Sequence, residues 1–173
     1  MIVRDARADE LAKVGEIRVA AYVADGFMSP ESGYAPTLRA LGLDGNGAVL
    51  VAVATEDDSQ ILGTVMLQPW PHAGQVVTGQ DEAEIRALAV IPETRGRGIG
   101  DALLRAVIER AAQQGVRYLV LLTQPEMLTA QRLYQHAGFR RLPDRDWSPA
   151  AGVTLLAYGL ALTGDSQAGP PRD

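Results

Sequence analysis

The hexapeptide at residues 95–100, with the sequence RGRGIG, lies between an apolar run and an amphipathic stretch. The apolar run Ile85–Ile91 is typical of a strand, and the apolar spacing over Asp101–Ala112 is typical of a helix. The chain is therefore predicted to pass from a strand through a glycine-rich turn into a helix. This unit constrains the fold more than any other segment, because it fixes two elements and the turn that joins them.

The turn has the features of an anion-binding site. Backbone N–H groups at the start of a helix have no intrahelical acceptor and hold partial positive charge, so they stabilise a phosphate placed there. Glycine lets the backbone approach a ligand closely because it has no Cβ. Arginine adds donors suited to bidentate phosphate contacts. We therefore predict that a diphosphate binds at Arg95, Gly96, Arg97, Gly98, Ile99 and Gly100.

Two common diphosphate motifs do not match this turn. A dinucleotide fingerprint, counted from Gly96, requires a third glycine where the chain has Asp101. A nucleotide P-loop requires a lysine, and the turn has none. A glycine- and arginine-rich surface turn without a ligand is the alternative that remains open at this point.

A second motif follows in the last third of the chain. Gly115 is a natural helix C-cap, and the apolar run Arg117–Thr123 is typical of a strand buried on both faces. The next segment, Thr129–Phe139, has apolar residues at helical spacing and a glycine, Gly138, that ends the helix. The pattern A-x-x-L-Y-x-x-x-G-F occupies residues 130–139.

Together the two motifs resemble those of the GNAT superfamily of N-acetyltransferases. Arg95-x-x-Gly98-x-Gly100 matches the acetyl-CoA consensus Gln/Arg-x-x-Gly-x-Gly/Ala, and residues 130–139 match the second hallmark of the superfamily. The resemblance implies an α+β, three-layer fold, in which helices flank a mixed, mostly antiparallel sheet splayed between its fourth and fifth strands. It also implies that acetyl-CoA is the acyl donor and that its pantetheine arm bonds to the backbone of Leu88, Ala89 and Val90.

Acetyl transfer requires an unprotonated amine, and an alkylamine with a pKa of about 10.4 calls for a general base. Glu84 resembles the glutamate that some members of the superfamily use as the base, often through water. The alternative is a partly solvated carboxylate at a strand end, paired with Arg86. His72 is a second candidate base, because an imidazole titrates near neutrality, although a lone loop histidine usually has no such role.

The departing thiolate requires a proton donor, and Tyr134 matches the general-acid tyrosine of the superfamily. A phenol with a pKa near 10 is protonated at neutral pH and can donate to a thiolate. The alternative is a tyrosine that only packs on an amphipathic helix. Seven residues earlier, where the superfamily often has an asparagine that touches the cofactor, the chain has Met127, and Gln124 is a possible substitute.

The remaining elements follow from periodicity and from turn residues. One helix is expected with the acidic Asp9 and Glu10 in its first turn and Leu11, Val14, Ile17 and Ala21 on its apolar face. Residues 24–46 are expected to form a loop with a short helical piece at 37–41. Further strands are predicted at Ile2–Arg4, Ala48–Thr55, Ile61–Trp70 and Val153–Ala161. We expect one domain at residues 1–162 and a disordered tail at 163–173.

Composition excludes several function classes. The 173 residues include no cysteine and only two histidines, so no metal site is expected. The net charge of −5 argues against sequence-independent binding of nucleic acid. No apolar run approaches about 18 residues, so we expect neither secretion nor membrane insertion, and a cytoplasmic location. A homodimer is an expectation from the habit of the superfamily alone.

The acceptor is predicted to be a primary amine on a small molecule or an amino-acid derivative. Three loops, Tyr22–Tyr34, Trp70–Gly79 and Asp144–Trp147, mix aromatic residues with carboxylates and would suit a cation. Aromatic residues that close the core beside solvated acids are the alternative. A protein N-terminus or lysine side chain is an alternative acceptor. A non-catalytic acetyl-CoA sensor is a third possibility, which the presence of both Glu84 and Tyr134 disfavours.

Overall fold

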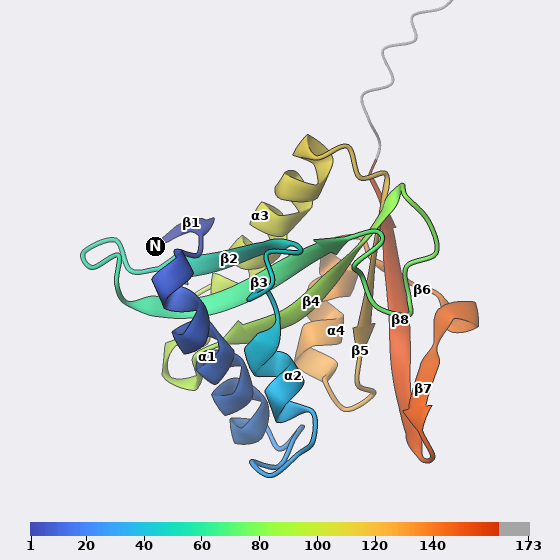
Figure 1. Cartoon of the computed structure of the whole chain (residues 1–173), viewed down its shortest axis with the longest axis horizontal. Helices are drawn as coiled ribbons and strands as arrows, with labels where there is room; N and C mark the ends of the chain where they lie inside the picture. The colour runs from blue at the N-terminus through green and yellow to red at the C-terminus, as the bar shows by residue number, and fades with distance from the viewer. Residues whose placement is uncertain (163–173) are drawn as a thin grey trace, which may run out of the picture.

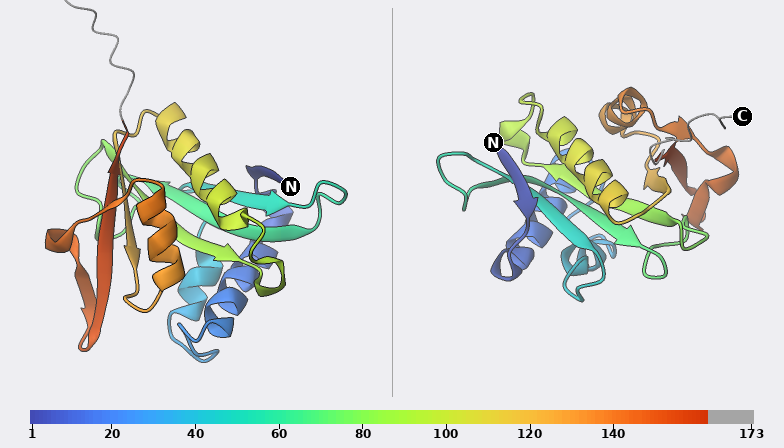
Figure 2. Two further views of the ribbon diagram at one scale, coloured as in Figure 1. Left: turned by 180° about the vertical axis from the view of Figure 1, so that it is seen from behind. Right: turned by 90° about the horizontal axis from the view of Figure 1, so that it is seen from above.

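Two layers of helices enclose one sheet in this computed structural model, which describes residues 1–162. Helices α1 (Leu11–Ala24) and α2 (Ala35–Ala40) cover one face, and α3 (Ile99–Gln113) and α4 (Leu128–His136) cover the other (Figures 1 and 2). Short 3₁₀ turns occupy Ala8–Glu10, Pro92–Thr94 and Pro143–Arg145. The strands are β1 (Ile2–Asp5), β2 (Ala48–Val53), β3 (Ile61–Pro69), β4 (Glu82–Val90), β5 (Tyr118–Thr123), β6 (Arg140–Arg141), β7 (Trp147–Ala150) and β8 (Val153–Ala161). The tail predicted at residues 163–173 lies outside the described residues.

The sheet has the strand order β1-β2-β3-β4-β5-β8-β6, with β7 paired to β8. All neighbouring strands are antiparallel except β4 and β5, which are parallel. The predicted α+β class with a mixed, mostly antiparallel sheet is therefore confirmed. Strands β6 and β7 were not predicted, because each is short and lacks an apolar run.

Strands β4 and β5 separate after a short paired segment. Their register joins Glu82–Ile85 to Tyr118–Leu121 and extends no further. In Figure 1 the two strands lie together at the top and diverge toward the bottom, with α4 beside the opening. The predicted splay is thus present. Beyond Ile85, the edge of β4 that faces β5 has no strand partner among residues 1–162.

A β-bulge interrupts β4 at this point. Ala87 has a φ of 52°, which is uncommon for a residue other than glycine. Arg86 and Ala89, three residues apart on β4, pair with residues only two apart on β3. The extra residue reverses the alternation of side chains, so Ile85 and Leu88 both contact the core under α3 and α4. Arg86 lies on the opposite face from Ile85, toward α1 and α2.

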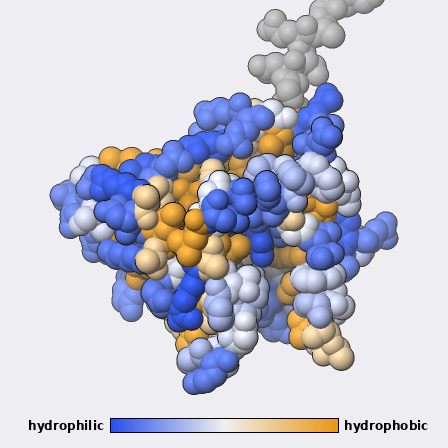
Figure 3. Space-filling view, in the orientation of Figure 1, coloured by the Kyte–Doolittle hydropathy of each residue, from blue (hydrophilic) through white to orange (hydrophobic). Residues whose placement is uncertain are grey.

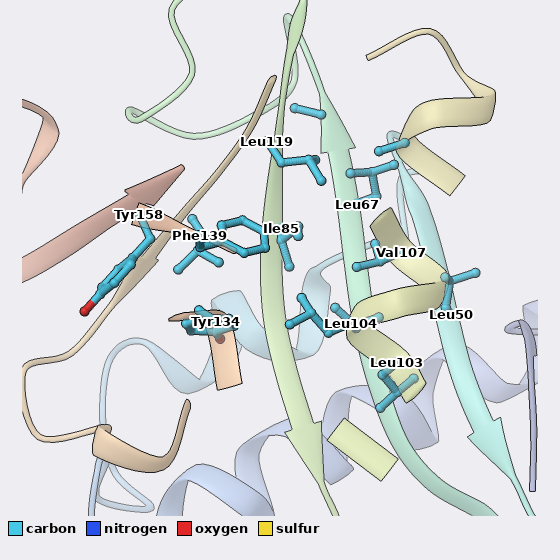
Figure 4. Close-up of a cluster of buried hydrophobic side chains, with 14 of the residues drawn as sticks. Leu50, Leu67, Ile85, Leu103, Leu104, Val107, Leu119, Tyr134, Phe139 and Tyr158 are labelled. Atoms are coloured by element: carbon cyan, nitrogen blue, oxygen red, sulfur yellow. The ribbon is translucent and has the colours of Figure 1, made fainter. Parts of the chain in front are cut away.

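The main hydrophobic core lies between the sheet and α3. Leu103, Leu104 and Val107 are fully buried and extend from α3 toward β3 and β4 (Figure 4). Burying a leucine side chain contributes about 1.5–3 kcal/mol. The face shown in Figure 3 is mostly hydrophilic, with apolar residues in patches near its centre. None of the helices within residues 1–162 has the length and apolar character needed to cross a bilayer.

The predicted elements agree with the structure to within a few residues. Helix α3 begins at Ile99, two residues before the predicted start, and β4 begins at Glu82. On α1 the predicted core positions Val14, Ile17 and Ala21 are buried, whereas Leu11 is only half-buried. The short helix predicted at 37–41 is α2.

Candidate functional site

A cavity of about 820 Å³ opens where β4 leaves β5. Its walls come from the end of α1, the last residues of β4, the turn before α3, and α4. Most of the predicted cofactor-binding residues line it, namely Leu88, Ala89, Val90, Arg95, Gly96, Gly98, Ile99 and Gly100. Arg97 is exposed and does not line the cavity.

The glycine-rich turn requires glycine for its backbone conformation. Gly96 and Gly98 have φ values of 77° and 73°, in the left-handed region that other residues rarely adopt. A Cβ added at either position would meet no atom of residues 1–162 within 4 Å, so this part of the chain leaves open space there. The first amide to bond within the helix is that of Ala102, which donates to the Gly98 carbonyl at 3.0 Å. The preceding amides of α3 are therefore left without intrahelical acceptors.

Arg95 is held at the cavity wall by Asp25, the residue that follows α1. Arg95 Nη2 lies 2.9 Å from Asp25 Oδ2, and Nη1 contacts the other carboxylate oxygen. Nη2 also donates to the Val90 carbonyl oxygen at 3.4 Å. Asp25 belongs to the loop Tyr22–Tyr34, which the sequence predicts to line the acceptor cleft. In the structure its carboxylate occupies the donors that a phosphate would use.

Tyr134 lies on α4 beside the cavity and does not line it. Its ring packs against Phe139 and Tyr158, with centroids 6.0 and 6.3 Å apart (Figure 4). The side chain is 7% exposed, and burial raises the pKa of its phenol. Within residues 1–162 the hydroxyl donates no hydrogen bond, so it is free to donate to a ligand. The neighbouring Tyr22, which lines the cavity, has a pKa that is raised first by burial and then by the proximity of Tyr134.

Glu84 is 5% exposed and lies outside the cavity lining. Oε2 accepts a hydrogen bond from the Gly74 N–H at 2.7 Å, and Oε1 is 3.8 Å from Arg86 Nε. Burial raises the pKa of this carboxyl, against the opposing effects of Arg86 and the Gly74 amide. The pairing with Arg86 is as predicted, but the carboxylate is buried rather than partly solvated. His72 is exposed and does not line the cavity.

Helix α4 supplies cavity residues that were not predicted. Thr129, Arg132 and His136 line the cavity along one face of the helix, at spacings of three and four residues. This spacing is visible in the sequence, but nothing in it tells which face meets the cavity. Met127 also lines the cavity, whereas the Gln124 side chain donates to the Phe27 carbonyl oxygen at 3.4 Å.

The predicted mixture of aromatic residues and carboxylates does not gather as a group. Of that set, only Tyr22, Asp25 and Phe27 line the cavity. Asp146 is ion-paired to Arg141, and the other acids of these loops, Glu31 and Asp144, are exposed. Trp147 begins β7 and is 38% exposed. In the part of the chain that the structure describes, no three His, Asp or Glu side chains converge as metal ligands would.

Comparison with known proteins shows which family the chain resembles in sequence. The family model described as the acetyltransferase (GNAT) family matches residues 14–139. A mycothiol acetyltransferase from Cellulomonas flavigena is 32% identical over 110 residues, which cover 58% of this chain and 32% of that protein. An amino-acid acetyltransferase from Ralstonia nicotianae is 36% identical over 90 residues, which cover 51% of this chain and 18% of that protein. The chain thus spans about a third or less of the length of these curated relatives.

Solved structures share the whole architecture. A phosphinothricin acetyltransferase from Sinorhizobium meliloti, in complex with acetyl-CoA, matches with a TM-score of 0.69 and 22% identity. The match covers 99% of this chain and 93% of that one. At this identity the likeness establishes the fold.

Proposed function

Because the chain belongs to the GNAT family of acetyltransferases, we propose that it moves the acetyl group of acetyl-CoA to a primary amine of a small molecule or amino-acid derivative. One observation supports the proposal most: a single cavity joins the glycine-rich turn to the unpaired edge of β4. The names of two relatives, mycothiol acetyltransferase and amino-acid acetyltransferase, are consistent with a small-molecule acceptor.

The cavity has the size and chemistry that acetyl-CoA requires. A volume of about 820 Å³ lies within the range of small-molecule and cofactor sites. The free amides at the start of α3, together with Arg95, would hold the diphosphate. The backbone of Leu88, Ala89 and Val90 would hold the pantetheine arm. When bound, acetyl-CoA supplies an acetyl group activated as a thioester.

Two side chains would move the protons. Glu84 would take the proton of the attacking amine, through water because the carboxylate lies outside the cavity lining. Its raised pKa brings the carboxyl closer to the range in which a general base works. Tyr134 would donate to the departing thiolate, and its unengaged hydroxyl and raised pKa both keep a proton available.

The test is an assay of free thiol release. Purified protein is incubated with acetyl-CoA and with separate panels of amino acids, simple amines and peptides. We expect thiol release with at least one small amine and little with the peptides. Release with peptides alone would favour a protein acceptor instead. Tight acetyl-CoA binding without release for any acceptor would contradict an enzymatic role and favour a sensor.

A further inference from the structure

Arg18 is a buried arginine whose charge the fold leaves without a counterion. It lies on α1 with no exposed surface, and within residues 1–162 it forms no ion pair. Nη1 donates to the carbonyl oxygens of Leu38 and Leu41, at 3.1 and 2.8 Å. Nε and Nη2 are buried with no partner in the same part of the chain. A buried charged group without hydrogen-bond partners is costly, so its presence requires an explanation.

The surroundings of Arg18 place it next to the proposed active site. It precedes Ala21 and Tyr22, which line the cavity, by three and four residues and therefore shares their face of α1. Burial lowers the pKa of the Arg18 guanidinium to about 10, Tyr22 opposes this shift, and Arg86 adds to it. The guanidinium remains charged at neutral pH. Helix α1, which carries Arg18, packs against β4, which carries Arg86 on the same face of the sheet, so the two guanidiniums repel each other.

Arg86 is the accessible member of this pair. Its side chain is 21% exposed, and it projects from β4 immediately before the bulge at Ala87. Nη1 donates to Gln68 Oε1 at 3.0 Å, and Nε is 3.8 Å from Glu84 Oε1. Among residues 1–162, Glu84 is the carboxylate that pairs with Arg86. Even with Glu84 ionised, the three groups together retain a net positive charge, although none of the three lines the cavity itself.

We propose that Arg86 and Arg18 select an acceptor that bears a carboxylate near its amine, as a free amino acid does. The inference rests on the proposed function, whose acceptor class it narrows. Arg86 would contact the carboxylate, because a guanidinium matches it with paired donors. Arg18 is a positioning residue, which adds its charge from beneath the surface where a low dielectric strengthens the interaction. The hydrogen bonds that Arg18 donates to Leu38 on α2 and to Leu41 just after it come from Nη1 alone within residues 1–162. The contact with α2 therefore does not account for the rest of the guanidinium.

The test compares acceptors that differ only in the carboxylate. Acetylation of L-leucine, L-phenylalanine and L-methionine is measured beside that of their amides, and the ratio of kcat/KM for acid over amide is the readout. We expect the wild-type protein to prefer the acids. A charge-assisted hydrogen bond is worth about 1.5–3 kcal/mol, so Arg86→Gln should lower the ratio roughly 10- to 100-fold. Intrinsic differences between an acid and its amide cancel when the ratio is compared between variants.

Controls separate recognition from folding. Arg39→Gln removes a guanidinium from α2 that is paired with Glu16 at the surface, and it should leave the ratio unchanged. Arg18→Met removes the buried charge and should lower the ratio, whereas Arg18→Lys keeps the charge and should retain most of it. A purely structural role for Arg18 would not move the ratio in either variant. If neither Arg18 variant folds, the ratio measured for Arg86→Gln alone tests the carboxylate site.

The outcomes distinguish the two proposals. Equal use of acids and amides by the wild-type protein, or an unchanged ratio in Arg86→Gln, would overturn the carboxylate site and leave the acetyltransferase function standing. Absence of thiol release with every acceptor would overturn both.

Discussion

At the scale of single residues, Tyr134 offers the sharpest test of mechanism. Its hydroxyl makes no hydrogen bond within residues 1–162, whereas its ring packs on Phe139 and Tyr158. Tyr134→Phe retains this packing and removes only the proton donor. We expect kcat to fall roughly 100-fold, the lower end of general-acid contributions, with the Kd for acetyl-CoA unchanged. Single-turnover kinetics and calorimetry measure the two quantities separately, and wild-type turnover would exclude the acid role.

Glu84 predicts a specific pH dependence. A general base works only when ionised, and burial raises the pKa of this carboxyl above its ordinary value of 4.5. Activity should therefore fall as the pH drops through this raised pKa. In Glu84→Gln we expect the fall in kcat/KM at acidic pH that is due to this carboxyl to disappear. The part of the pH profile that is due to the amine of the acceptor should remain. A profile of unchanged shape would point to another base.

The same shift predicts how Glu84 affects stability. A carboxyl whose pKa is higher in the folded than in the unfolded protein favours folding most below the unfolded pKa. That contribution is lost as the pH rises through the folded pKa. At pH 7 to 8, Glu84→Gln should therefore keep or raise the midpoint of thermal unfolding. A loss of activity in this variant would then not be a loss of fold.

Residues within a motif were predictable, and residues brought in by the fold were not. Arg95 and Gly98 were identified because they lie in one short pattern. The contact between Arg95 and Asp25 joins positions 70 residues apart, so no local pattern could reveal it. Arg18 was missed because a charged residue on a helix normally faces solvent, and only the packing of α2 against α1 buries it.

At the scale of elements, the structure of the turn before α3 predicts that two variants change the affinity for acetyl-CoA in opposite directions. The double variant Arg95→Ala/Gly98→Ala removes a charge-assisted contact and forces alanine into a left-handed conformation, so acetyl-CoA should bind roughly 10- to 100-fold more weakly. Asp25→Asn frees the Arg95 guanidinium from its ion pair, so acetyl-CoA should bind more tightly. Isothermal titration calorimetry measures both affinities.

Circular dichroism of the same variants provides the control, since both are expected to keep the fold. Equal affinity in the double variant and the wild-type protein would count against the placement of the diphosphate. Weaker binding in Asp25→Asn would mean that Asp25 positions Arg95 rather than competing with the ligand.

Long elements were predictable from periodicity because their apolar residues repeat over several turns or strand pairs. The amphipathic stretch predicted at Asp101–Ala112 forms α3, and its apolar residues Leu103 and Val107 are fully buried. The bulge at Ala87 has no sequence signature, because glycine rather than alanine is the residue that favours a positive φ. The pairing of β3 with β4 holds Ala87 in this conformation. Strand β6, two residues long, is likewise specified by its contact with β8.

At the scale of the whole molecule, the site is a consequence of the sheet. The parallel pairing of β4 and β5 ends at Ile85, and the opening that follows becomes a cavity closed by α1, α3 and α4. The resemblance to a known family implied that β4 and β5 separate in this way. Composition alone could not have predicted this separation. The acceptor was not predictable, because Arg18 and Arg86, the residues proposed to select it, lie on separate segments that only the folded chain brings together.

The central claim is that acetyl-CoA binds with its diphosphate on the amides of the turn before α3. Titration of ¹⁵N-labelled protein with acetyl-CoA, followed by amide NMR, tests this most directly. We predict that the largest shifts at saturation occur at Gly98, Ile99 and Gly100, with a second group on β4 at residues 88–90. Unchanged amides at these positions, with acetyl-CoA bound, would contradict the account.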